Sequence, residues 1–136
     1  MVQTHCEKNS IAGLPPKYLD AGFTTRSVLH ITVDKDYAVF GMAVWKDTLR
    51  ILISDDNGLP NWYPIELFSV KDARLPDDWL FAFFGNDESS HLQALWGYRN
   101  LVIDEQHYDA LVERDERALA IFAQERAKHQ DDESRL

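Results

Sequence analysis

The sequence predicts an α+β domain in which an antiparallel curled sheet, or an SH3-like half-barrel, of about five strands precedes one or two C-terminal helices. Two observations lead to this fold class. Between residues 27 and 84, short apolar runs, several of them alternating with polar residues, are separated by brief turn sequences. This pattern is typical of strands in a small antiparallel sheet. After the loop at 85–90 the apolar spacing shifts toward 3.6, which is typical of helices.

The strand prediction is clearest for TLRILIS, in which Leu49, Ile51 and Ile53 are expected to face the core and the intervening residues to face outward. The preceding run is apolar on both faces, which indicates a central strand that is covered on both sides. Pro64 has no amide hydrogen, so its strand should begin there or lie at a sheet edge. The expected strands are 27–33, 37–45, 48–54, 63–70 and 79–84.

The helical region is expected to contain a break. Asp104 can cap a helix that runs to about Glu113, and Asp115 can cap a second helix from Glu116. One continuous helix also fits the spacing, but it would place Asp115 on the apolar stripe, which favours the break. Gly97, between two large rings in LWGY, suggests a close backbone approach or a bulge, and LWGY is expected to be a short strand or turn that docks the helices onto the sheet.

The domain organisation follows from these patterns. Residues 1–26 are expected to form an irregular N-terminal arm, because they are polar and interrupted by glycine and proline. Residues 27–130 are expected to form a single α+β domain, and residues 131–136 a frayed tail. A chain of 136 residues is long enough to bury a core of its own.

The overall charge limits the classes of partner. The formal net charge is −9 and the sequence pI is about 4.9, so the surface should repel nucleic acid and anionic lipid and attract basic proteins. The apolar runs are far shorter than the ~20 residues that cross a bilayer. Cys6 is the single cysteine, and the first residues carry no secretion-signal pattern. We therefore expect a cytoplasmic protein with no nucleic-acid or membrane partner.

No motif in the chain specifies catalysis or a cofactor. The sequence has no G-x-S-x-G elbow and no phosphate-binding glycine loop, and its five histidines lack zinc-site spacing. Asp55-Asp56-Asn57-Gly58 is not an EF-hand loop, because the position-1 and position-12 residues would be Ile53 and Pro64. It is better interpreted as a turn between two strands. We expect neither a metal site, nor a cofactor, nor an enzyme, although an acid–base site built from carboxylates remains a third alternative.

Aromatic residues beside paired carboxylates are the candidate binding surface. Rings that face outward next to acidic loops fit a protein-binding patch for a basic partner. A solvated acidic turn beside a buried ring would explain the same residues. The candidate partner-binding residues are Asp55, Asp56, Trp62, Tyr63, Asp77, Asp78 and Trp79.

Four motifs resemble the immunity proteins of bacterial polymorphic-toxin and contact-dependent growth inhibition systems: WYPIELF at 62–68, LPDDW at 75–79, LWGY at 95–98 and HYDALVERD at 107–115. The resemblance implies a cytoplasmic inhibitor that binds one cognate toxin domain, often a nuclease, and occludes its active site. It carries over no site residue. The alternative is an SH3-like adaptor that binds a peptide in an aromatic groove, lined by Trp62, Tyr63 and Pro64.

Overall fold

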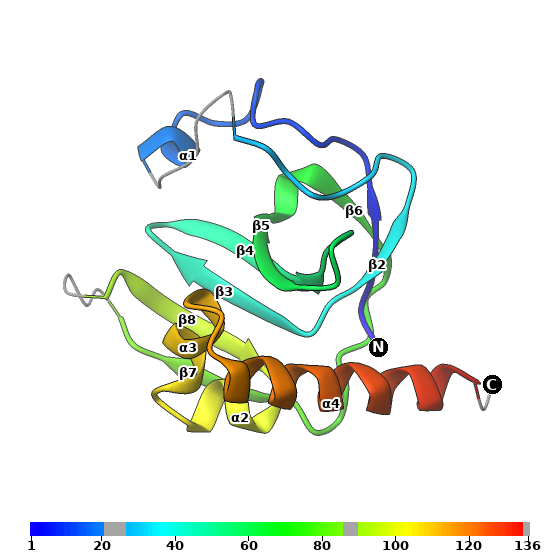
Figure 1. Ribbon diagram of the computed structural model, residues 1–136. Helices are drawn as coiled ribbons and strands as arrows, with labels where there is room; N and C mark the ends of the chain where they lie inside the picture. Colours follow the sequence, from blue (N-terminus) through cyan, green and yellow to red (C-terminus); the bar gives the residue numbers. More distant parts are fainter. Residues whose placement is uncertain (21–26, 86–89, 135–136) are drawn as a thin grey trace.

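The computed structural model describes residues 1–20, 27–85 and 90–134, with side chains described except at 19–20 and 130–134. It confirms the α+β fold class. A three-stranded and a five-stranded antiparallel sheet pack together, and the C-terminal helices lie on the far side of the larger sheet (Figure 1). The sheets do not close into a barrel.

The elements follow one another closely along the chain. The strands are β1 Gln3–Cys6, β2 Asp36–Ala38, β3 Gly41–Trp45, β4 Thr48–Ser54, β5 Pro60–Pro64, β6 Phe68–Asp72, β7 Leu80–Phe83 and β8 Leu92–Gly97. The helices are α1 Lys17–Asp20, the 3-10 helix η1 Ile65–Leu67, α2 Arg99–Ile103, α3 His107–Val112 and α4 Glu116–Ser134. The larger sheet has the order β5-β4-β3-β8-β7 and the smaller one β2-β1-β6.

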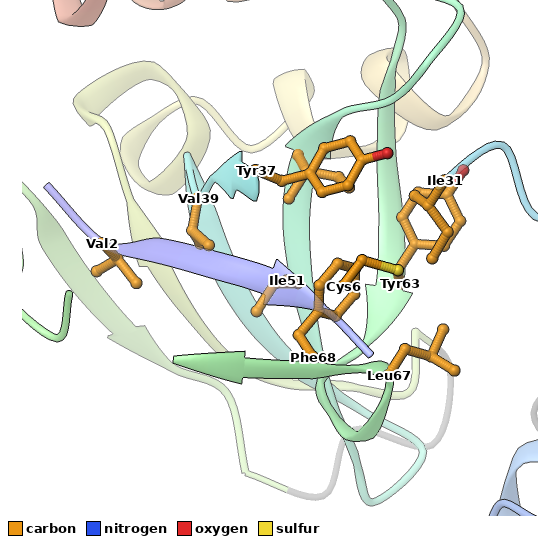
Figure 2. Packing of buried hydrophobic residues seen from close by; sticks show 10 residues of the cluster. Val2, Cys6, Ile31, Tyr37, Val39, Ile51, Tyr63, Leu67 and Phe68 are labelled. Atoms are coloured by element: carbon orange, nitrogen blue, oxygen red, sulfur yellow. The ribbon is translucent and has the colours of Figure 1, made fainter. Parts of the chain in front are cut away.

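Strand β4 lies between two hydrophobic cores. Ile51 and Ile53 point into the first core, between the two sheets, whereas Leu52 points into the second, between the larger sheet and the helices. All three are fully buried, so the expectation that Leu52 faces outward is wrong. The C-terminal helices cover the face that alternation alone assigned to solvent. Figure 2 shows the first core, to which β1, β5 and β6 contribute Cys6, Tyr63 and Phe68.

The N-terminal residues differ from the irregular arm expected over 1–26. Gln3–Cys6 form β1, which pairs antiparallel with both β2 and β6 and is the middle strand of the smaller sheet. Val2, Thr4 and Cys6 alternate inward, and the Thr4 hydroxyl donates to the carbonyl of Tyr37 at 2.9 Å. Residues 3–6 thus form a strand although few of them are apolar, because β2 and β6 supply partners for their backbone hydrogen bonds. Residues 21–26 lie outside the described residues.

Three expected strands differ from the structure, and one of them, 37–45, is divided between β2 of the smaller sheet and β3 of the larger one. Residues 27–33 form no strand, and their backbone makes isolated contacts, such as the Asp56 amide donating to the carbonyl of His30 at 2.9 Å. The expected strand 63–70 is divided by η1, which carries the chain from the larger sheet to the smaller one. Pro64 ends β5 and precedes this bend, as its missing amide allows.

The turn and the helix break are confirmed. Gly58 has a φ of 74° and its amide donates to the carbonyl of Asp55, closing the β4–β5 hairpin. Helix α3 ends at Val112 and α4 begins at Glu116. The Asp115 carboxylate accepts the amides of Arg117 and Ala118 at 3.2 and 3.4 Å. Helix α4 continues to Ser134, beyond the start of the expected frayed tail.

Candidate functional site

A groove of about 1040 Å³ lies between the larger sheet and helices α2 and α3. Its floor comes from β3, β4, β5 and β8, and its opposite wall from residues 101–112. The lining residues are mainly apolar and aromatic: Trp45, Leu52, Pro60, Trp62, Phe84, Leu92, Leu95, Leu101, Val102, Ile103, Tyr108, Leu111 and Val112. A concave apolar surface of this size is the usual form of a binding site.

The floor of the groove follows from strand register. Leu52 of β4 stands opposite Trp62 of β5, so both side chains lie on the helix-facing side of the sheet. The Trp62 ring packs against the Tyr108 ring of α3, with centroids 5.6 Å apart. Sheet and helix are thereby joined at one end of the groove, and the aromatic surface is held in place.

The opposite wall is held by two close contacts. Leu101 of α2 docks where Gly41 of β3 pairs with Gly97 of β8. A Cβ added to Gly41 or Gly97 would lie 2.6 or 2.7 Å from the Cδ2 atom of Leu101. Two glycines are therefore needed for this approach. This confirms the prediction that Gly97 brings helix and sheet together.

The second contact joins Tyr98 and His107. Both side chains are buried, and the Tyr98 hydroxyl lies 2.6 Å from Nε2 of His107. Burial lowers the pKa of His107, against a smaller opposing effect of Asp104. The neutral ring can accept the hydroxyl hydrogen, and this hydrogen bond ties the start of α3 to the end of β8.

Apolar side chains at the mouth of the groove are unusually exposed. Phe84 is 47% exposed, Ile103 57% and Val112 58%. They come from three segments and line the same groove. Large apolar side chains that gather around a concavity, rather than being scattered over the surface, mark a site of interaction.

Charges of both signs line the groove, in different places. Arg50 is the single basic residue among those that line it, and its guanidinium lies over the Trp45 ring, 4.6 Å from the centroid. Its Nε donates to the Thr48 hydroxyl at 3.1 Å, and burial lowers its pKa. Asp104, Glu105 and Asp109 lie at the outer edge and are exposed. We call these three carboxylates the acidic rim.

The acidic rim belongs to a longer acidic segment. Residues 104–116 contain six carboxylates and one basic residue, Arg114. All six acidic residues are exposed. The guanidinium of Arg114 donates to the side-chain oxygen of Asn61 at 2.9 Å, which attaches this segment to β5. Six of the 23 acidic residues of the chain thus lie in one segment beside the groove.

The first two candidate residues from the sequence have structural roles. Asp55 is 5% exposed, and its carboxylate accepts the amides of Asn57 and Leu59, the side chain of Asn61 and the hydroxyl of Tyr63. It holds the β4–β5 turn together, and its side chain is buried.

Asp56 closes a neighbouring network. It accepts the Tyr37 hydroxyl at 2.6 Å, the Thr32 hydroxyl at 2.7 Å and Lys35 at 3.0 Å. Desolvation is the largest single effect on its pKa and raises it, but the three hydrogen bonds together lower the pKa to about 2. Asp55 and Asp56 also line a smaller cleft of about 420 Å³, which includes Arg126 and His129 and so carries mixed charge.

The candidate aromatic residues lie on different faces of the molecule. Tyr63 is 4% exposed and belongs to the first core, so the expectation that it faces outward is wrong. Trp62, its neighbour, points to the opposite side of β5 and into the groove. Trp79 is half-buried at the border of the first core. Of the three rings, only Trp62 lines the groove.

The remaining candidates, Asp77 and Asp78, lie outside the groove. Both are exposed, and Asp78 forms an ion pair with Lys128 of α4 at 2.9 Å. The seven residues that the sequence selected are therefore divided among a turn, a core, the groove and the α4 side of the molecule. They do not form one surface, and their role in binding stays a prediction.

Most residues of the groove give no sign of their position in the sequence. Ile103 and Val112 carry no signal of their own, because an exposed apolar residue looks like a core residue in a sequence. The six carboxylates of 104–116 were visible as a charge run and could have suggested the acidic rim. Arg50, which alternation predicts to face outward, is half-buried and lines the groove, because helices cover that face of the sheet.

The described residues contain no group of three or more His, Cys, Asp or Glu side chains placed to bind a metal ion. Across the same ranges, no helix combines the length and hydrophobicity needed to traverse a bilayer. Comparison with protein-family models, curated proteins and solved structures gives no match.

Proposed function

We propose that the protein is a cytoplasmic inhibitor that binds a basic toxin domain, as immunity proteins do, and that the groove is its binding surface. The observation that carries the proposal is the meeting of exposed apolar side chains and an acidic rim around one concavity. Phe84, Ile103 and Val112 offer apolar contact, and the neighbouring carboxylates offer charge. Interfaces commonly combine an apolar centre with a polar border.

The groove is suited to an apolar side chain of a partner protein, with basic residues on either side of it. The aromatic floor made by Trp62 and Tyr108 can receive the apolar group, and the acidic rim can receive Lys or Arg beside it. A nuclease active site that attracts phosphates is basic, so it has the charge that the rim complements. Binding there would occlude the site, and the net charge of −9 would speed the encounter.

A peptide-binding adaptor is the second candidate, and the aromatic lining of the groove favours it. Trp45, Trp62 and Tyr108 lie along one concavity together with Pro60. Aromatic grooves receive proline-rich or apolar peptides in adaptor domains. In this case a short basic peptide would bind alone, whereas an inhibitor of the first kind requires a folded partner.

The test begins with the partner: the product of the neighbouring open reading frame, or the protein that a pull-down from the native host recovers, is purified as the candidate toxin domain. Titration of the full-length chain against that purified domain gives the affinity, and co-expression gives protection of growth. We expect Ile103→Asp combined with Val112→Asp to weaken binding about tenfold or more and to abolish protection. Both side chains are exposed, so the fold should persist.

Leu75→Asp is the matched control, because Leu75 is 50% exposed and does not line the groove. It should bind and protect like the wild type. Failure of the wild-type chain to bind the toxin domain, with tight binding of short basic peptides instead, would favour the adaptor. Equal binding by the groove double variant and the wild type would show that the interface lies elsewhere.

A further inference from the structure

The larger sheet has an open edge at β7. This strand is last in the order β5-β4-β3-β8-β7 and pairs with β8 alone. The Phe84 amide donates to the carbonyl of Gln93 at 2.8 Å. Because backbone groups alternate along an antiparallel strand, the amides and carbonyls of Phe81 and Phe83 point away from β8. Among the described residues, no second strand pairs with these donors and acceptors.

The other three sheet edges in the described residues carry features that oppose pairing. Strand β5 begins and ends with proline, β6 contains Lys71 and Asp72, and β2 is three residues long and starts with Asp36. Charge, proline and short length are the usual protection of an edge strand. Strand β7, LFAF, has no charged residue and no proline.

Two aromatic side chains of β7 are exposed to solvent. Phe81 is 56% exposed and Phe83 74%, and both point to the face of the sheet opposite the groove. Phe81 packs on Trp96 of β8, with centroids 4.9 Å apart, but its outer side has no described neighbour strand. An unprotected edge combined with exposed aromatic rings on one face is a template for another strand.

We propose that β7 pairs antiparallel with β7 of a second copy of this chain, with Phe81 opposite Phe83 of the partner subunit. A twofold axis through Ala82 creates this pair twice. In this register the outward backbone groups of Phe81 and Phe83 meet those of the other copy, which forms four hydrogen bonds. The two five-stranded sheets become one continuous sheet.

A second copy fits this edge for two reasons. The strand is self-complementary, because the two phenylalanines stand symmetrically about the small side chain of Ala82. In the dimer, the Phe81 ring, which already packs on Trp96, would also contact Phe83 of the partner subunit as a cross-strand aromatic pair. The axis is perpendicular to the sheet, so both grooves open on the same side of the dimer. This pairing is independent of the proposed function.

The dimer and the binding of a basic partner respond oppositely to salt. Each copy carries a net charge of −9, so two copies repel each other. Raising the ionic strength from about 0.05 M to about 0.5 M screens this repulsion and should strengthen the dimer. The same change should weaken binding of a basic toxin domain. Failure of one proposal can thus be distinguished from failure of the other.

The experiment is sedimentation velocity of the full-length chain over a concentration series at both salt levels. We expect a reversible monomer–dimer equilibrium. Phe83→Pro removes one outward amide and leaves the hydrogen bonds to β8 intact, so it should weaken the dimer about tenfold or more. Phe81→Lys introduces a charge at the edge and should do the same. Leu75→Lys, an equally exposed apolar position outside β7, should dimerise like the wild type.

Hydrogen exchange of the wild-type chain supplies a readout that needs no variant. The amides of Phe81 and Phe83 should exchange slowly at high concentration and rapidly at low concentration. A wild-type chain that stays monomeric at about 1 mM would overturn the proposal. So would a dimer in which these two amides stay unprotected or in which both β7 variants dimerise normally. Loss of toxin-domain binding by monomeric β7 variants would assign the edge to that partner instead.

Discussion

The hydroxyl of Tyr98 lies 2.6 Å from Nε2 of His107, and both side chains are buried between β8 and α3. This pair holds one wall of the groove. Replacing Tyr98 with Phe would leave a buried ring nitrogen without its donor. We expect a loss of about 1–3 kcal/mol in the free energy of unfolding, measured by urea denaturation. An unchanged midpoint would show that the hydrogen bond is not important for stability.

His107 should also make stability depend on pH. Burial lowers its pKa in the folded state below the ordinary value of 6.5, so the unfolded state binds the proton first as the pH falls. This contribution to stability is present above about pH 6.5 and declines as the pH decreases. The urea midpoint of the wild type should therefore fall between about pH 7 and pH 5, and His107→Gln should flatten that fall.

His5 provides the contrast. Hydrogen bonds to Asp36 and Asp34 raise its pKa, so its contribution has the opposite sign: it is present below about pH 6.5 and is lost as the pH rises through the raised value. His5→Gln should make the fall of the wild-type midpoint toward acid steeper. If both histidine variants changed the pH profile in the same direction, the assignment of the two groups would be wrong.

The packing of Leu101 on Gly97 predicts the effect of one added methyl group. Gly97→Ala would bring a Cβ to 2.7 Å from Leu101 Cδ2 and 3.0 Å from the carbonyl oxygen of Phe40. We expect destabilisation of about 1–3 kcal/mol by thermal unfolding. Leu101→Ala creates space at the same point, so the double variant should lose less than the sum of the two single changes. Strict additivity would contradict the contact.

Asp55 and Asp77 should behave differently although the sequence selected both. Asp55→Ala removes the acceptor of four hydrogen bonds in a buried turn, so we expect a loss of about 2 kcal/mol or more. Asp77→Ala changes an exposed side chain and should stay within about 0.5 kcal/mol of the wild type. Equal urea midpoints for the two variants would refute the structural role of Asp55.

The acidic rim should control the rate at which a basic partner binds. Asp104→Lys combined with Glu105→Lys should slow association with the toxin domain and reduce its salt dependence, as measured by stopped flow. Dissociation should change less, because exposed rim charges act mainly on encounter. Asp77→Lys is the control, because Asp77 is exposed but does not line the groove. This variant should keep most of the salt dependence of the association rate. An unchanged rate in the rim variant would place the interface elsewhere.

Local patterns predicted those parts of the fold that neighbouring residues decide. The strands 48–54 and 79–84 were found because apolar residues recur over a few positions, and the break before Glu116 because Asp115 caps its own helix. The β1 strand was missed because Gln3–Cys6 has few apolar residues and depends on β2 and β6. The bend at η1 was missed because alternation continues through it.

The amino-acid sequence by itself determined the α+β class, the turn at Asn57-Gly58, the helix break at Asp115 and the acidic character of the chain. These features depend on local backbone preference and on charge, which need no distant partner. Only the tertiary structure decided that Tyr63 is buried while Trp62 lines a groove. It also decided that Asp55 supports a turn, and that exposed apolar residues distant in sequence, Phe84, Ile103 and Val112, line the same groove. The reason is that burial and concavity depend on which layers cover each face of the sheet, and those layers come from segments far apart in the chain.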